Sequence, residues 1–249
     1  MEQNKKRVML TVAYDGTNYC GWQVQPNGVT IEGVLTETLT ELLKEEVTII
    51  GASRTDAGVH ALCNVAVFDT TSRIPAEKMS YALNTSLPED IRIVGSKEVE
   101  ADFHPRHCES HKTYEYRIVN SEFINPIKRL YRHHTYLKCD VEAMQKAASY
   151  LVGEHDFKSF CTVGAQVEST VRTITDLQVL REEDEIIIRV TGTGFLYNMV
   201  RIIAGTLLEV GYGRMNADDL PAILEACDRQ AAGPTAPAKG LCLVKYEFM

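Results

Sequence analysis

Residues 47–69 read VTIIGASRTDAGVHALCNVAVFD, two apolar runs on either side of a polar loop. Apolar and β-branched runs bounded by glycine and polar residues are typical of β-strands, so the pattern predicts strands over 47–52 and 61–69. The loop between them, 53–60, gathers an arginine, a threonine, an aspartate and a histidine beside glycines that permit tight turns. The segment therefore predicts a sheet edge that can present a carboxylate.

On both sides of this segment, the first hundred residues alternate predicted strands and helices. The further elements are a strand at 7–14, a helix at 31–42, a helix at 75–83 and a strand at 91–94. Thr30 is the predicted N-cap of the first helix, whose apolar residues recur with the helical period. The order strand, helix, strand, strand, helix, strand predicts an α+β fold.

The second half continues with the same kinds of element. They are a strand at 113–119, a helix from its cap Asp140 to about Gly153, a hairpin of strands at 173–180 and 186–190, an apolar helix at 196–210, a helix from its cap Asn216 to about Cys227, and a closing strand at 241–248. These predictions rest on capping residues, turn signals and apolar periodicity.

Composition excludes several classes of protein. The 249 residues are 45% hydrophobic and 24% charged with a net charge of −8, which excludes disordered, collagenous and coiled-coil chains. The N-terminus lacks the apolar core of a signal peptide, and no run approaches the length of a membrane span. Seven scattered cysteines without a CxxC pair indicate free thiols in a reducing compartment. We therefore expect a cytoplasmic protein that does not bind membranes.

Charge is unevenly distributed along the chain. Residues 101–138, called here the basic segment, hold seven lysines and arginines, four acidic residues and five of the seven histidines. Such a bias is compatible with a solvated charged face and equally with a groove that binds a phosphate-bearing ligand.

Three side chains are candidates for chemistry. Asp56 can act as a nucleophile or base, or it can accept hydrogen bonds from backbone amides in a turn. Arg201 lies in an otherwise apolar predicted helix, where a guanidinium needs a carboxylate or phosphate partner such as Asp56. A structural ion pair or a solvent-facing arginine would equally explain Arg201. Tyr114 opens a strand in the basic segment, where it suits an unstacked base or simply packs in the sheet.

Several familiar sites are missing from the sequence. It has no dinucleotide-binding fingerprint, no phosphate-binding loop, no HExxH and no GxSxG motif. His133 and His134 are adjacent and cannot place two ligands on one helical face, so we expect no metal site. The residues alone thus predict an enzyme or binder with a carboxylate, an arginine and an anion-binding middle segment.

The segment 53–61, SRTDAGVHA, resembles the catalytic motif GRTDAGVHA of the tRNA pseudouridine synthase A family. Other stretches resemble family signatures in the same order along the chain. They are Tyr14-Asp-Gly, Gly21-Trp-Gln23, Leu83-Asn84 with Leu87-Pro88, Asp102-Phe-His-Pro-Arg106, Lys112-Thr-Tyr-Glu-Tyr-Arg117, Gly192-Thr-Gly-Phe-Leu196, Met199-Val-Arg201 and Ala236-Pro-Ala-Lys-Gly-Leu241. The resemblance covers essentially the whole chain.

This resemblance implies an activity and roles for four residues. Members of the family convert uridines at positions 38, 39 and 40 of the tRNA anticodon stem-loop to pseudouridine, as homodimers and without a metal or organic cofactor. By the same resemblance Asp56 is the catalytic aspartate, Tyr114 contacts the target base, and Arg201 is the partner of Asp56. Arg54 helps to extrude the base or holds the backbone.

The implied reaction fits these residues. Uridine isomerisation cleaves the C1′–N1 bond, turns the bound uracil and joins C5 to C1′, so one carboxylate suffices because no water has to be activated. Asp56 can attack C1′ or take a proton from C2′, and the sequence does not choose between these steps. Stacking on Tyr114 would return about 1–3 kcal/mol of the cost of extruding the base. The predicted phosphate contacts are Arg106, Lys112, Lys128, Arg129 and Arg132.

Two departures from the family pattern leave other functions open. Ser53 replaces the usual glycine of the motif, and Glu32 stands where the family often has glutamine. The alternatives are a non-catalytic tRNA-binding or tRNA-folding paralogue, a synthase with a shifted RNA site, and a nucleosidase acting on free nucleosides. We expect two halves, 1–105 and 106–249, that share an extended, mainly antiparallel sheet flanked by helices, with the active cleft between them.

Overall fold

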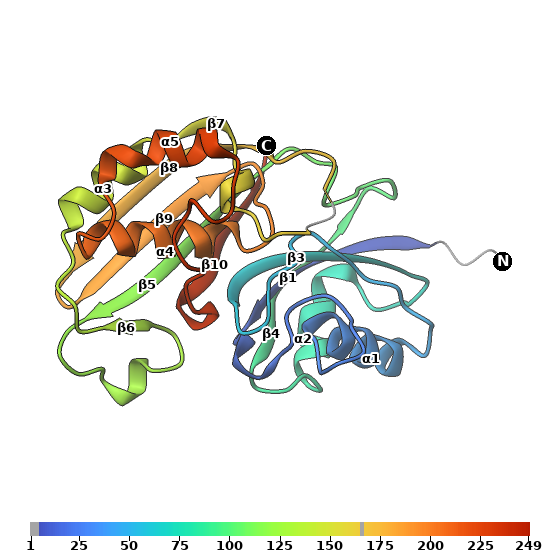
Figure 1. Ribbon diagram of the computed structural model, residues 1–249. Helices are drawn as coiled ribbons and strands as arrows, with labels where there is room; N and C mark the ends of the chain where they lie inside the picture. Colours follow the sequence, from blue (N-terminus) through green and yellow to red (C-terminus); the bar gives the residue numbers. More distant parts are fainter. Residues whose placement is uncertain (1–4, 165–166) are drawn as a thin grey trace. The chain divides into compact units, whose positions relative to one another are not determined.

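The computed structural model describes residues 5–164 and 167–249 (Figure 1). The chain divides into two compact units. The first contains the residues up to Ser110 together with Leu243–Met249, and the second is His111–Cys242. The end of the chain therefore groups with the first unit, although it follows the second in sequence. Both units combine mainly antiparallel strands with flanking helices, which confirms the predicted α+β class; the predicted cleft between the halves stays a prediction.

The first unit is built on an antiparallel sheet with the strand order β4-β1-β3-β10 and with β2 paired to β3. Its strands are β1 (Lys6–Tyr14), β2 (Ile50–Gly51), β3 (His60–Thr70), β4 (Ile91–Val99) and β10 (Leu241–Phe248). Its helices are α1 (Ile31–Leu43) and α2 (Met79–Asn84). Helix α2 packs against β4 and α1 packs against α2 (Figure 1).

Both faces of this sheet carry apolar side chains. Val8, Leu10 and Val12 share one face because strand side chains alternate, and all three are fully buried. Met9 points to the other face, where it belongs to a second, separate hydrophobic cluster. Phe248 of β10 packs against this second cluster. This second cluster explains why the C-terminal strand belongs to the first unit.

Three predictions for the first unit need correction at their boundaries. The predicted strand 47–52 is reduced to β2, because residues 47–49 bury their apolar side chains without pairing to a strand. The predicted helix 75–83 begins as a 3-10 turn, Ala76–Lys78, before α2. Strand β4 continues to Val99, well past the predicted end, because backbone pairing with β1 extends beyond its apolar residues. The Thr30 cap is confirmed, since its side chain accepts a hydrogen bond from the Gly33 N–H.

The second unit has the strand order β5-β9-β8-β7, with the short strand β6 parallel to β5. Its strands are β5 (Ser110–Asn120), β6 (His133–Thr135), β7 (Gly153–Asp156), β8 (Val171–Glu182) and β9 (Glu185–Gly192). Its helices are α3 (Val141–Ser149), α4 (Met199–Gly211) and α5 (Leu220–Ala226). Helix α3 packs against β8 and α4 (Figure 1).

The predicted hairpin and helices of this unit are present, but several boundaries differ. Helix α3 ends at Ser149, not near Gly153, which begins strand β7. The predicted helix 216–227 begins as a 3-10 turn, Ala217–Asp219, before α5. Helix α4 begins at Met199, not at Leu196, because Asn198 adopts a left-handed conformation with a φ of 60° that no α-helix contains. Strands β6 and β7 were not predicted, since runs of three and four mostly polar residues lack a strand pattern. Among the described residues, no helix has the length and apolar character that a bilayer crossing requires.

An ion pair in the first unit makes its stability depend on pH. Arg7 donates from Nε to Asp69 Oδ1 at 2.7 Å and from Nη2 to Oδ2 at 2.9 Å. These hydrogen bonds lower the pKa of Asp69 below its usual range. Because the folded pKa is depressed, the pair stabilises the protein above the unfolded pKa of about 3.9 and loses this contribution as the pH falls through the folded pKa.

We expect Asp69→Asn to lower the free energy of unfolding by about 1 kcal/mol at pH 7. The difference from the wild type should shrink as the pH falls through the depressed folded pKa of Asp69. Urea unfolding at several pH values measures this, with the exposed Glu77→Gln as the control. A deficit that stays constant from pH 7 to acid would contradict the ion-pair explanation.

Candidate active site

The loop that carries Asp56 is held by hydrogen bonds at Ser53 and Thr55, on the N-terminal side of the aspartate. Trp22 donates its backbone N–H to the Thr55 carbonyl at 3.0 Å, and the Tyr14 hydroxyl lies 2.7 Å from the Thr55 hydroxyl. Asn64 of β3 donates to the Ser53 carbonyl at 3.0 Å and accepts from its N–H at 3.3 Å. The backbone on both sides of Arg54 is therefore fixed to the sheet.

Glycines let a neighbouring segment pack directly on this loop. A Cβ at Gly16 would lie 2.0 Å from the Val59 carbonyl oxygen, and one at Gly21 would lie 2.6 Å from the Thr55 carbonyl oxygen. Gly21 also has a φ of +84°, which disfavours any other residue. Val59 donates its N–H to the Asp56 carbonyl at 3.1 Å, so Asp56 opens a tight turn. The segment 16–21 thus supports the loop from outside the motif.

Asp56 and Arg54 differ in their exposure. Asp56 is half-buried, whereas Arg54, two residues earlier, is exposed. Ser53, the residue that departs from the family motif, is buried, and its hydroxyl oxygen has no hydrogen-bond partner within the described part of the chain. The departure therefore adds a small buried polar group without touching the carboxylate. Trp22 is fully buried and packs under the loop, with its ring 5.9 Å from that of Tyr14.

Arg106 lies beside this loop, which the sequence pattern did not indicate. It donates from Nε to the Gly51 carbonyl at 2.7 Å, across 55 positions of the chain. Burial lowers the pKa of Arg106, and the positive charge of Arg54 lowers it further. Two guanidinium groups of the first unit are thus close enough to repel each other.

Tyr114 of β5 is buried in the second unit. It pairs with Val190 of β9, and its ring contacts that of Phe195 edge-to-face, with the centroids 5.2 Å apart. Phe195, which sequence reasoning did not single out, therefore lies against a candidate site residue. Its position in the stretch 192–196, which matches a family signature, was the available signal.

Arg201 lies in the first turn of α4 and is anchored within the second unit. It donates from Nε to the Ala236 carbonyl at 2.8 Å and from Nη1 to Asn198 Oδ1 at 2.7 Å. The Ala236 N–H in turn donates to the Arg201 carbonyl at 3.0 Å. These contacts fix where the guanidinium points. Its pairing with Asp56, which belongs to the other unit, stays a prediction.

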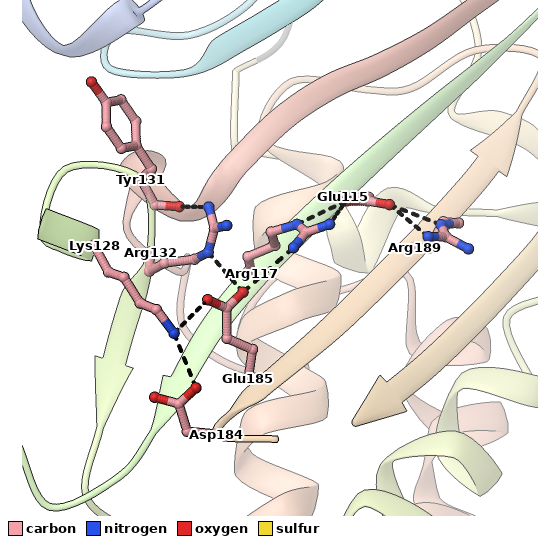
Figure 2. A network of polar contacts seen from close by, with 8 residues as sticks. All are labelled: Glu115, Arg117, Lys128, Tyr131, Arg132, Asp184, Glu185 and Arg189. Atoms are coloured by element: carbon pink, nitrogen blue, oxygen red, sulfur yellow. Dashed lines mark hydrogen bonds and ion pairs between the residues drawn. The ribbon is translucent and has the colours of Figure 1, made fainter. Parts of the chain in front are cut away.

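Two of the predicted phosphate contacts have carboxylate partners (Figure 2). Lys128 lies 3.0 Å from Asp184 and 2.9 Å from Glu185, and Arg132 donates to Glu185 at 2.8 Å. Hydrogen bonds with Glu185 and Asp184 raise the pKa of Lys128, so it stays charged and paired. The basic segment therefore offers less free positive charge than its composition suggests, whereas Arg129 is exposed.

The same network continues along the sheet. Glu115 of β5 is buried and accepts hydrogen bonds from Arg117 at 2.9 Å and from Arg189 at 2.8 Å. Figure 2 shows these contacts leading to Glu185 through Arg117, which lies 3.4 Å from it. The network ties the loop after β5 to the β8–β9 hairpin.

Across residues 5–164 and 167–249 no group of three His, Cys, Asp or Glu side chains is arranged to hold a metal ion.

Comparison with known proteins identifies the class of enzyme to which this chain belongs. The sequence model of a family described as tRNA pseudouridine synthase, a family of isomerases, matches residues 10–107 and 147–249. The chain belongs to this family, as its motifs predicted.

Three relatives that match nearly the whole chain have the same name. "tRNA pseudouridine synthase A" of Thermoanaerobacter sp. (strain X514) is 50% identical over 243 residues, which cover 98% of this chain and 100% of the relative. The protein of that name from Acetivibrio thermocellus is 50% identical with the same coverage. That from Brevibacillus brevis is 48% identical over 96% of this chain and 98% of its own length.

Proposed function

We propose that the protein isomerises uridine to pseudouridine at positions 38, 39 and 40 of the tRNA anticodon stem-loop. The observation that carries this proposal is Asp56 within SRTDAGVHA, on a loop held by hydrogen bonds at Ser53 and Thr55, in a chain 50% identical to a named tRNA pseudouridine synthase A over 98% of its length. A fixed loop is what a reacting carboxylate needs, because misplacing it would cost rate.

Asp56 is the catalytic aspartate in this proposal. It attacks C1′ of the target nucleotide or removes a proton from C2′, and either step breaks the C1′–N1 bond. The uracil turns while bound and rejoins C1′ through C5; the C5 proton then leaves to solvent and N1 takes up a proton, so nothing is oxidised or reduced. Arg201 pairs with Asp56 and keeps the carboxylate ionised in a desolvated site. Its anchoring to Asn198 and Ala236 supports this orienting role.

Tyr114 contacts the extruded base. Its ring is held against β9 and Phe195, so little side-chain freedom remains to be lost when the base binds. Stacking is worth about 1–3 kcal/mol per base, which is comparable to the few kcal/mol that unstacking costs. Arg54, exposed beside Asp56, holds the RNA backbone or helps the base to leave its stack.

We also propose a cytoplasmic homodimer. The seven cysteines form no disulfide within the described part of the chain, which suits a reducing compartment. The dimer rests on the family resemblance alone, and sedimentation of the purified protein tests it. A single species with the mass of one chain would remove the dimer and leave the activity unaffected.

Tritium release from a tRNA transcript labelled at C5 of uridine tests the proposed activity. We expect release with the wild-type protein and complete loss from a transcript in which the uridines at 38, 39 and 40 are replaced by cytidine. Sequencing-based mapping locates the product. Release that persists from the cytidine transcript would keep the chemistry and overturn the site. Tight tRNA binding without tritium release would favour the non-catalytic paralogue, and release of uracil from free uridine would favour a nucleosidase.

A further inference from the structure

We propose that Arg54 and Arg106 together hold one RNA phosphate beside the Asp56 loop. This inference rests on the proposed function, because it assigns the phosphate to the tRNA substrate. It turns two separate cations, one in the family motif and one in the basic segment, into a single anion site.

The geometry of Arg106 is fixed at the base of the loop. Its Nε–H donates to the Gly51 carbonyl, and Gly51 pairs with Ala66 at the end of β2. Gly51 packs directly against Trp22, since a Cβ there would lie 2.2 Å from the indole nitrogen of Trp22. One edge of the Arg106 guanidinium is thus tied to rigid backbone, while its Nη groups donate to no acceptor among the described residues.

The turn that carries Arg106 is also ordered. The rings of His104 and His107 are stacked, with centroids 3.9 Å apart and planes 15° from parallel. The Arg106 N–H donates to His104 Nδ1 at 3.3 Å, and the His107 N–H donates to the His104 carbonyl at 3.0 Å. A preordered arginine loses less side-chain freedom when it binds an anion.

The charges around the pair leave it without a counterion. No carboxylate lies within ion-pair distance of either Arg54 or Arg106 in the part of the chain that the structure describes, unlike Arg7, which pairs with Asp69. Arg54 lowers the pKa of Arg106, whereas Glu32 acts in the opposite direction. Glu32 already accepts a hydrogen bond from the Val24 N–H at 3.0 Å. Two cations that repel each other are both stabilised when a shared anion binds between them.

A phosphate diester of the substrate is the anion that fits this pair. Guanidinium groups bind phosphate oxygens with paired hydrogen bonds, and a nucleic acid supplies such groups at every nucleotide. Arg54 and Asp56 are two positions apart, so their Cα atoms lie within about 7 Å of each other. The phosphate held by the pair therefore lies close to the reacting nucleotide along the RNA chain.

Binding of unmodified tRNA tests the shared site. The measurement compares Arg54→Gln, Arg106→Gln and the double variant in an Asp56→Asn background, so that the tRNA stays unmodified. We expect each single change to weaken binding about tenfold and the double change to add little. The slope of log K against log salt should fall by only about 0.7–0.9 in the double variant, the value for one phosphate. Arg73→Gln is the matched control, an exposed arginine beyond the far end of β3.

A second measurement changes the RNA one phosphate at a time. Transcripts with a single neutral methylphosphonate at each phosphate near the target uridine should show one position at which binding falls about tenfold in the protein with both arginines. The same substitution should have no effect once Arg54 and Arg106 are both glutamine. A flat scan would mean a site for free anions and would overturn the proposal, as would additive single changes or an Arg106 effect no larger than that of Arg73. Binding needs no turnover, so failure of the proposed activity is seen separately, in tritium release.

Discussion

Asp56→Asn is expected to lower the single-turnover rate of tritium release at least about 10³-fold. The amide has nearly the shape of the carboxylate, but it can neither attack C1′ nor accept a proton from C2′. The turn that Asp56 opens uses its backbone carbonyl, which accepts from the Val59 N–H, so the loop should keep its conformation. Rapid mixing of excess enzyme with C5-tritiated transcript measures the chemical step directly.

Two controls separate a lost reaction from a lost structure. Glu77→Gln changes an exposed carboxylate of the same unit outside the loop and should release tritium at the wild-type rate. The Asp56→Asn protein should bind unmodified tRNA within about threefold of the wild type, because Asp56 contributes no attraction for phosphate. If Asp56→Asn keeps more than a tenth of the wild-type rate, another group performs the reaction and the proposed role is wrong.

Local signals explain which parts of the fold were predictable. The Thr30 cap, the β8–β9 hairpin and strand β10 follow from neighbouring residues, and the structure confirms all three. Residues 47–49 were assigned to a strand because apolar runs report burial, whereas pairing depends on a partner strand elsewhere in the chain. The start of α4 was missed because the left-handed conformation of Asn198 has no local pattern.

The residues of the candidate site also divide into those that local sequence predicts and those that depend on distant contacts. Asp56, Arg54 and Tyr114 could be named because they lie in contiguous motifs. The Arg106 contact with Gly51 spans 55 positions, and Lys128 meets Asp184 across 56, so neither could be read from spacing. Counting charges in the basic segment consequently overestimated its free cations and overlooked the position of Arg106 beside the loop.

Gly205→Ala is expected to destabilise the second unit, although alanine favours helices by about 1 kcal/mol over glycine. Gly205 is buried in α4, and a Cβ there would lie 1.8 Å from the carbonyl oxygen of Pro234. Overpacking of this kind costs about 1–3 kcal/mol or more, and a backbone atom cannot rotate away as a side chain would. The close approach therefore outweighs the helix propensity, and we expect a net loss of about 2 kcal/mol.

The same substitution should also reduce activity, because the displaced segment holds Arg201. Ala236 exchanges two hydrogen bonds with Arg201, and the Gly233 N–H donates to Thr206 Oγ1 at 2.9 Å. Moving this segment off α4 breaks the contacts that orient the guanidinium. A loss of 2 kcal/mol corresponds to a fall of about 4–8 °C in the unfolding midpoint for a chain of this size.

Thermal unfolding and tritium release of the Gly205→Ala protein measure the two effects together. Gly95→Ala is the control, because its added Cβ would meet only the Thr11 side chain at 3.7 Å, an ordinary contact, and it should leave both values near those of the wild type. An unchanged or higher unfolding midpoint for Gly205→Ala would mean that helix propensity dominates and that residues 233–236 move away from the added Cβ at little cost. A lower midpoint with full activity at a temperature where the protein stays folded would mean that Arg201 is oriented without the Ala236 contacts.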